Sequence, residues 1–309
     1  MLTFPKPENL DQIITVSPSQ LDVWYKCKFN WKLSYKDNWT TASTVNQRKG
    51  GLIHLFDKEF YDLFINQPVM PVSMEQLIEI KDKYEGDYLR IEDVTMFYWA
   101  FTTFCRYTDY AAANDDFIPL ATETEFWAPT GLIFDGREVY LHGIIDLLVD
   151  RGGNLGIVDH KTYGSERGRW TADMVYFDQQ LQFYALALHL LGYTPTFGMI
   201  NGINSYEYKT QQPVDKLFAR EEVVINAKRL EIYKDNIYQT IKEMRTAESF
   251  PKRWCKDCKY CGYREVCDLI LRGQNPAGLL EMKHSRDKAP LTIAPITLDE
   301  LDVMIDNEH

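Results

Sequence analysis

Hydrophobic and polar residues alternate along the chain with two periods, one typical of helices and one typical of strands. The helical period predicts helices over residues 17–35, 49–64, 73 onward, 92–112, 172–191 and 226–246. Shorter apolar runs bounded by turn residues predict strands over 121–127, 141–149, 155–158 and 196–202, with an edge strand over 221–225. Strands preceded, interrupted and followed by helices favour an α/β core with helical additions.

The stretch LHGIIDLLVDRGGNLGIVDHK, residues 141–161, has the pattern of a β-hairpin. A two-residue loop at 152–153 sets a register in which Asp146 falls directly opposite Asp159. Opposed residues share one face of a sheet at about 4.5–5.5 Å, where like charges are destabilising. Lys161 lies two residues beyond Asp159 and therefore points to the same face. The hairpin thus predicts two facing carboxylates beside a lysine.

A divalent cation would convert this repulsion into coordination, because Mg²⁺ and Mn²⁺ favour oxygen ligands. Lys161 would then hold or polarise an attacking water, or stabilise charge that develops on a phosphate. Such a site suits the hydrolysis of phosphodiesters. The residues alone also allow a plain alternative, in which Lys161 neutralises Asp159 in a salt bridge.

Three further side chains extend the candidate site. Gln180 and Tyr184 stand one helical turn apart, where Gln180 could contact a phosphate or base and Tyr184 could stack on a base or orient a catalytic group. The alternative is that Tyr184 belongs to the core and Gln180 to its rim. His54, in KGGLIHLFDKEF, would add a nitrogen ligand and make Mn²⁺ at least as suitable as Mg²⁺.

The composition limits the class of protein. A hydrophobic fraction of 45% indicates a folded globular chain, and no apolar run is long enough to span a bilayer. The amino-terminal residues lack a signal pattern, so we expect a soluble, cytoplasmic protein that acts on no membrane. A net charge of −11 argues against a surface coated with nucleic-acid contacts, although basic residues do gather locally at 26–49 and 252–264.

Four of the six cysteines lie in WCKDCKYCGYREVC, residues 254–267, which suggests metal ligation in a reducing compartment. Spacing alone allows a local four-thiolate site for zinc or iron–sulfur, formed by Cys255, Cys258, Cys261 and Cys267. Cys105 lies in an apolar helical stretch, where a core thiol is expected.

Four short motifs occur together in order: Gly51-x-x-His54, Gly143-x-x-Asp146, Asp159-x-Lys161 and Gln180-x-x-x-Tyr184. This set resembles the RecB-type branch of the PD-(D/E)XK nuclease superfamily, with agreement over residues 17–267. One departure is Asp159, where many members carry glutamate. The resemblance implies a restriction-endonuclease-like core, in which a mixed sheet is flanked by helices.

The resemblance also implies a role for each residue of the motifs. The metal would be bound by His54, Asp146, Asp159 and the backbone carbonyl of His160. The catalytic group would comprise Lys161 with Asp146 and Asp159, supported by Gln180 and Tyr184. Glu125, on the strand before the hairpin, would lie just outside these ligands.

The segment SPSQLDVWYKCKFNWKL resembles the amino-terminal cysteine segment of iron–sulfur nucleases in this group, such as the AddB nuclease domain and the CRISPR-associated adaptation nucleases. Their carboxy-terminal triplet resembles Cys258, Cys261 and Cys267. The resemblance implies a [4Fe–4S] cluster on these three thiols and Cys27, which we prefer to Cys255. Such a cluster would join both ends of the domain, so its loss should destabilise the protein.

We therefore expect a metal-dependent DNA exonuclease, acting on single strands or DNA ends in recombination, repair, phage DNA metabolism or CRISPR adaptation. The chain lacks a helicase-type phosphate loop and is not its own motor. Aromatic residues near basic ones could stack on unpaired bases, although we expect more of them to belong to the core: Trp24, Tyr25, Trp31, Trp39 and Trp170.

The expected organisation is one nuclease domain over residues 1–280 and an acidic tail over 281–309, which could bind a protein partner. One alternative is a non-catalytic DNA-binding or scaffolding protein that carries iron–sulfur or zinc. Another is a zinc-bearing interaction protein whose acidic tail binds the partner.

Overall fold

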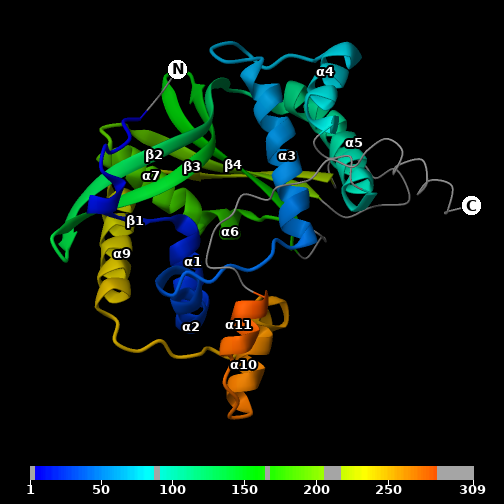
Figure 1. Ribbon diagram of the computed structural model, residues 1–309. Helices are drawn as coiled ribbons and strands as arrows, with labels where there is room; N and C mark the ends of the chain where they lie inside the picture. The colour runs from blue at the N-terminus through cyan, green and yellow to red at the C-terminus, as the bar shows by residue number, and fades with distance from the viewer. Residues whose placement is uncertain (1–3, 87–90, 164–167, 205–216, 284–309) are drawn as a thin grey trace, which may run out of the picture.

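The computed structural model of the protein describes residues 4–86, 91–163, 168–204 and 217–283. Figure 1 shows a twisted sheet with helices on both faces and the last two helices, α10 and α11, set apart from it. The predicted acidic tail lies outside the described residues, apart from Glu281–Lys283 in α11 (Ala277–Lys283). No helix in the described part of the chain is long and apolar enough to cross a bilayer.

The sheet has six strands and mixed direction. The strands are β1 (Ile13–Val16), β2 (Ile118–Phe134), β3 (Arg137–Arg151), β4 (Asn154–Tyr163), β5 (Pro195–Asn204) and β6 (Phe218–Val224). Their order is β1-β3-β4-β5-β6, and β2 pairs with β3. The β1–β3 and β4–β5 pairs are parallel and the others are antiparallel.

Strand β3 changes partners along one edge. Its Leu147–Arg151 end pairs with β4, and its Glu138–Leu141 end pairs with β1. Since β2 occupies the other edge along nearly the whole strand, β1 and β4 must share the same edge. Residues 142–146 are left between them, at the point where β4 leaves β3 and continues beside β5 alone. The separation of β3 and β4 therefore leaves residues 142–146 without a strand partner on this edge.

The predicted hairpin register is confirmed. Arg151 pairs with Asn154, and the ladder continues to Leu147 and Val158. Gly152 and Gly153 both have positive φ, as a two-residue hairpin turn requires. The ladder stops one step before the two carboxylates, so Asp146 and Asp159 stand where the strands separate rather than in a closed pair.

Helices cover both faces of the sheet. The described helices are α1 (Pro18–Lys26), α2 (Lys28–Trp31), a π-helical turn (Lys32–Lys36), α3 (Val45–Asp62), α4 (Met74–Glu85), α5 (Ile91–Asn114), α6 (Ala172–Tyr176), α7 (Gln179–Leu190), α9 (Ala227–Thr246), α10 (Arg264–Leu271) and α11, with short 3-10 turns at Leu10–Gln12 and Lys256–Tyr260. The capping box predicted at Ser73 is present, and α7 ends before Gly192, whose φ is +86°.

Two hydrophobic cores lie on opposite faces of the sheet. One packs helices α1, α7 and α9 against the sheet, with Trp24, Phe126 and Phe183 fully buried. The other packs α3, α4 and α5 against the opposite face, around Phe56 and Phe104. Helices therefore cover both faces of the mixed sheet, as expected for an α/β core.

A third, smaller cluster joins the two ends of the chain. Leu33 and Trp39 pack with Tyr263, Val266 and Leu280. The Tyr263 hydroxyl donates to the Trp39 carbonyl at 2.6 Å. The cysteine-bearing segments near residues 27 and 260 are thus held together by packing and hydrogen bonds.

Several predictions of local structure are corrected. The helix predicted over 17–35 breaks at Cys27, whose backbone is extended with φ −161° and ψ 109°. The helix predicted over 172–191 is two helices, because the Asp178 side chain caps α7 through the Leu181 N–H. Strand β1 was not predicted, since its four residues carry too little pattern to distinguish it from a loop. For the aromatic residues considered for base stacking, the core alternative is confirmed at Trp24, Trp31 and Trp39, which are buried.

Gly156 provides a test of the β4–β5 contact. A Cβ at this position would lie 2.0–2.5 Å from the ring of Phe197, its register partner on β5. We expect Gly156→Ala to lower the free energy of unfolding by about 1–3 kcal/mol through overpacking. Urea denaturation measures this change.

The matched control is Gly51→Ala in α3, where an added Cβ meets nothing within 4 Å. This variant should be neutral or more stable, by up to about 1 kcal/mol, because alanine favours helices. Equal stabilities for the two variants would contradict the packing at Gly156.

Candidate active site

Three potential ligands meet beside the parting of β3 and β4. His54 on α3, Glu123 on β2 and Asp146 on β3 each offer one atom, and these atoms all lie within 4.8 Å of one another. His54 Nδ1 lies 3.5 Å from Asp146 Oδ2. Ligand atoms around one Mg²⁺ or Mn²⁺ lie roughly 3–4 Å apart, so a small closure of this group would fit such an ion. One nitrogen and two carboxylates suit Mn²⁺ in particular.

Burial and mutual charge set the protonation of this group. Burial lowers the pKa of His54, but its hydrogen bond and attraction to Asp146 outweigh this and raise the value to about 9. Burial and the negative charge of Asp146 raise the pKa of Glu123 to about 7. The pKa of Asp146 falls to about 2, because contacts with His54 outweigh the effect of burial. Asp146 is therefore anionic and attracts a cation, whereas His54 is protonated near neutral pH and has to lose its proton before it can coordinate a metal.

Glu123 was missed in the sequence, where Glu125 was expected to lie near the ligands. Counting back from the β2–β3 turn, where Phe134 pairs with Arg137, would place Glu125 opposite Asp146. A bulge between Pro129 and Ile133 shifts the register by two residues, so Glu123 takes that position. Glu123 also has φ +41°, and Glu125 is exposed and contacts His142 Nε2 at 3.0 Å.

Asp159 and Lys161 form a second group on the side of α7. Lys161 Nζ lies 2.6 Å from Asp159 Oδ2 and donates to Gln180 Oε1 at 2.9 Å. The Gln180 amide donates to Asp159 Oδ1 at 2.9 Å and to the Tyr184 hydroxyl at 2.6 Å. The four residues singled out in the sequence, from β4 and α7, therefore make one continuous hydrogen-bonded set.

Lys161 is held as a cation. Burial lowers its pKa, but Asp159 and Asp146 outweigh burial, and the pKa is raised overall. Asp159 is fully buried, and burial together with Asp146 raises its pKa despite the adjacent ammonium. A lysine with a raised pKa stabilises negative charge and does not abstract a proton.

Tyr184 can lie close to β3 because residue 143 is glycine. A Cβ on Gly143 would come within 3.3 Å of the Tyr184 ring and within 3.0 Å of the Phe126 ring. A larger residue at this position would require the two rings to shift by a few tenths of an ångström. Tyr184 is also buried, as the core interpretation expected, and its supporting catalytic role stays a prediction.

His160 connects the two groups. Its backbone N–H donates to Asp146 Oδ2 at 2.7 Å, across the gap between β3 and β4. Its ring is buried, stacks on Tyr61 with centroids 5.7 Å apart, and has Nδ1 3.5 Å from Asp57 Oδ2. Burial lowers the pKa of His160 to about 3, so the ring is neutral. The predicted role of its carbonyl as a metal ligand stays a prediction.

A sequence profile described as the PD-(D/E)XK nuclease superfamily matches residues 15–268, most of the chain. The chain belongs to the PD-(D/E)XK nuclease superfamily. The mixed sheet flanked by helices is consistent with the core of that superfamily. No curated protein sequence matches the chain.

Two solved structures resemble this superfamily member. One is titled "Crystal structure of SSO0001" and has a TM-score of 0.41 and 14% sequence identity. The match covers 85% of this chain and 87% of the chain in that structure. The other is titled "Putative exonuclease" from Eubacterium rectale and has a TM-score of 0.44 and 13% sequence identity. The match covers 84% of this chain and 94% of the chain in that structure.

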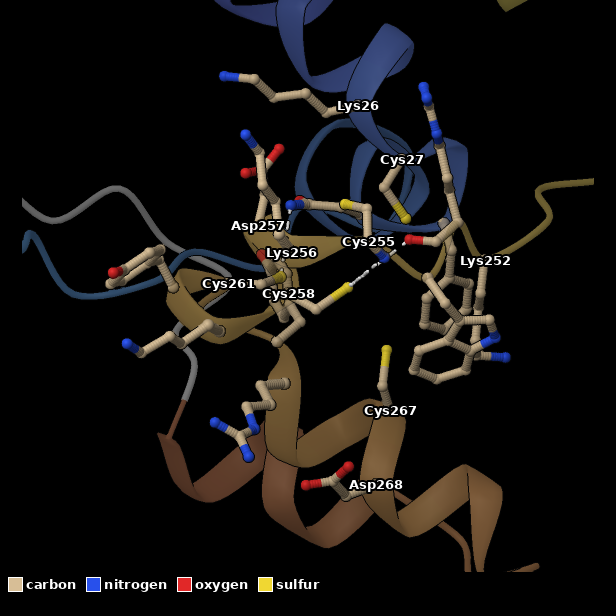
Figure 2. A pocket seen from close by; sticks show the side chains of 18 residues that line it. Lys26, Cys27, Lys252, Cys255, Lys256, Asp257, Cys258, Cys261, Cys267 and Asp268 are labelled. Carbon is tan, nitrogen blue, oxygen red and sulfur yellow. Dashed lines mark hydrogen bonds between the residues drawn. The ribbon is translucent and has the colours of Figure 1, made fainter. Parts of the chain in front are cut away.

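The predicted cysteines gather in one cavity of about 890 Å³ between the amino-terminal helices and α10. Figure 2 shows the side chains of Cys27, Cys258 and Cys267 pointing toward one another from three separate segments. Cys261 and the exposed Cys255 also line this cavity. Burial and then the neighbouring thiols, Cys27 among them, raise the pKa values of Cys261 and Cys267.

The spacing of the thiols differs from that of a closed zinc site. Zinc–sulfur bonds of about 2.3 Å in a tetrahedron place the sulfur atoms about 3.8 Å apart. Among the described residues, His54, Glu123 and Asp146 form the one group of three with ligand atoms within 4.8 Å, so no three cysteine sulfurs lie that close. Cys105, in contrast, is half-buried on α5, and burial raises the pKa of its thiol to about 11, as for an inert core cysteine.

A buried ionic network supports the wall behind His160. Arg220 lies 2.6 Å from Asp115 Oδ1, with side chains 13% and 0% exposed, and Tyr61 donates to the other Asp115 oxygen at 2.9 Å. Replacing Arg220 with leucine leaves this carboxylate buried without a cation, which should lower the free energy of unfolding by about 3–5 kcal/mol. Urea denaturation measures the loss.

The control is the double variant Arg220→Leu with Asp115→Asn, which removes both charges. It should recover most of the stability lost by Arg220→Leu alone. A double variant less stable than the single one would contradict the pairing.

Proposed function

We propose that the protein is a metal-dependent DNA exonuclease that hydrolyses phosphodiesters in single-stranded DNA or at DNA ends. The observation that carries this proposal is the pair of adjoining groups at the parted strands. His54, Glu123 and Asp146 form one group, and Asp159, Lys161, Gln180 and Tyr184 form the other. Membership of a nuclease superfamily supports the same chemistry.

The residues have separate roles in hydrolysis, namely metal binding and stabilisation of charge. Asp146, His54 and Glu123 would hold Mg²⁺ or Mn²⁺, with Asp159 and the His160 carbonyl completing the set as the family resemblance implies. When bound, the ion supplies Lewis acidity and lowers the pKa of a bound water. Lys161, kept cationic by Asp159, stabilises the charge that develops on the phosphate.

Gln180 and Tyr184 act on Lys161 rather than on the substrate. Gln180 accepts from the ammonium and donates to Asp159, so it fixes the orientation of both. The Tyr184 hydroxyl accepts from the same amide and sets which way that amide faces. These contacts limit the rotation of the long lysine side chain and keep its charge at one place.

We further propose that Cys27, Cys258, Cys261 and Cys267 hold a [4Fe–4S] cluster. Three observations support this ligand set: the shared cavity, the effect of Cys27 and Cys258 on the pKa values of Cys261 and Cys267, and a spacing wider than one zinc ion needs. The Cys267 thiol is influenced by Cys27, Cys258 and Cys261, whereas Cys255 is exposed. The cluster would add to packing that already joins both ends of the chain.

The nuclease proposal is tested with Asp146→Asn and Lys161→Ala. Each variant should reduce release of nucleotides from end-labelled single-stranded DNA, with Mg²⁺ or Mn²⁺, by at least roughly a hundredfold, because each removes charge from the reacting centre. Asp82→Asn and Lys228→Ala alter exposed charges on α4 and α9 and should retain activity. Undiminished cleavage by either site variant would refute the catalytic assignment.

The cluster proposal is tested with the matched variants Cys27→Ser and Cys255→Ser, purified without oxygen. Cys27→Ser should lose most of its iron and visible absorbance and should melt at lower temperature, because cluster binding is coupled to folding. Cys255→Ser should keep its iron. Iron kept by Cys27→Ser but lost from Cys255→Ser would show that Cys255 is the ligand in place of Cys27. A colourless wild-type protein loaded with zinc would refute the cluster.

A further inference from the structure

A basic surface surrounds the cysteine cavity of this acidic protein. The chain carries 45 acidic and 34 basic residues, yet the cavity is lined by six cationic side chains and two carboxylates. The cations are Lys26, Lys252, Arg253, Lys256, Lys259 and Arg264. Such a local reversal of sign favours a polyanionic ligand at this place.

Two aromatic side chains stand exposed on the same surface. Trp254 is 54% exposed and Tyr260 is 78% exposed, although large aromatic residues elsewhere in the described chain mostly fill the cores. Both belong to the cysteine-bearing segment and line the cavity with the cations. Lys259 Nζ lies 5.2 Å from the Tyr260 ring centroid, so charge and ring are presented together.

A second cavity, of about 1130 Å³, connects this surface to the candidate active site. It is lined by Gln180 and Tyr184. It shares five lining residues with the cysteine cavity, three of them cationic: Lys26, Arg253, Lys256, Cys255 and Asp257. Phe177, 69% exposed, adds a further aromatic ring beside Gln180. Gln180 and Tyr184 of the hydrogen-bonded group thus line one cavity, Trp254 and Tyr260 line the other, and the residues common to both cavities make the two adjacent parts of one groove.

We propose that this groove binds single-stranded DNA, with unpaired bases stacked on Trp254 and Tyr260 and backbone phosphates beside Arg253 and Lys256. This inference rests on the proposed nuclease function and specifies the path of its substrate. Aromatic faces bind unpaired bases because each base has a free π-face, which a duplex hides within its stack. The cations hold the backbone without reading its sequence.

The test measures equilibrium binding of a fluorescent oligothymidylate to the full-length, cluster-loaded protein in Ca²⁺ or EDTA, where cutting does not interfere. Trp254→Ala and Tyr260→Ala should each weaken single-strand binding by roughly tenfold, whereas Trp254→Phe and Tyr260→Phe should restore much of it. Lys256→Gln should lower the slope of log affinity against log salt by about 0.7. Tyr98→Ala, an aromatic residue 45% exposed on α5, is the matched control and should bind normally.

Hydrolysis of the p-nitrophenyl ester of thymidine 5′-phosphate, which is too short to span the groove, separates the two proposals. The aromatic variants should hydrolyse this ester at the wild-type rate and retain their iron. Unchanged single-strand affinity, or an equal loss for duplex DNA, would overturn the stacking path. If no variant nor the wild type cut any phosphodiester but the binding losses remained, the nuclease function would fail and the groove would stand.

Discussion

The separation of β4 from β3 is the constraint on which the candidate site depends. Two carboxylates directly opposed in a closed ladder would repel each other, and a continuous ladder would have placed Asp146 and Asp159 in that position. Instead the β3–β4 ladder ends at Leu147 and Val158, and the other end of β3 pairs with β1. The His160 N–H, released from the ladder, is used to hold Asp146. The opening thereby makes room for side chains from α3 and α7 at a single place.

Helices on the two faces of the sheet each contribute side chains to this opening. Helix α3 brings His54 to Asp146, and helix α7 brings Gln180 and Tyr184 to Lys161. Close packing on both faces keeps these helices at their distances, and Gly143 is the position where a side chain would interfere. The proposed chemistry therefore relies on the packing of two hydrophobic cores. The cysteine segments form a separate unit that extends the same groove.

Short-range patterns made much of this arrangement predictable. Gly152 and Gly153 fixed the hairpin register, and alternation placed Asp159 and Lys161 on one side. Helical spacing put Tyr184 one turn from Gln180, and the family motifs added His54. Glu123 was not found because its position depends on a bulge six to ten residues further along β2, which no local pattern reveals. The break at Cys27 was missed for a similar reason, since its surroundings favour a helix on both sides.

The sequence by itself determined most of the helices and strands, the order of the motifs and the residue types that suit a divalent cation and a thiolate-bound cofactor. These features depend on neighbours a few residues apart, whose physics is local. Only the tertiary structure decided that Glu123 joins His54 and Asp146, that Trp24, Trp31 and Trp39 are core, and that Trp254 and Tyr260 are exposed. These outcomes depend on which distant segments exclude water from one another, and the packing of the whole chain sets that exclusion.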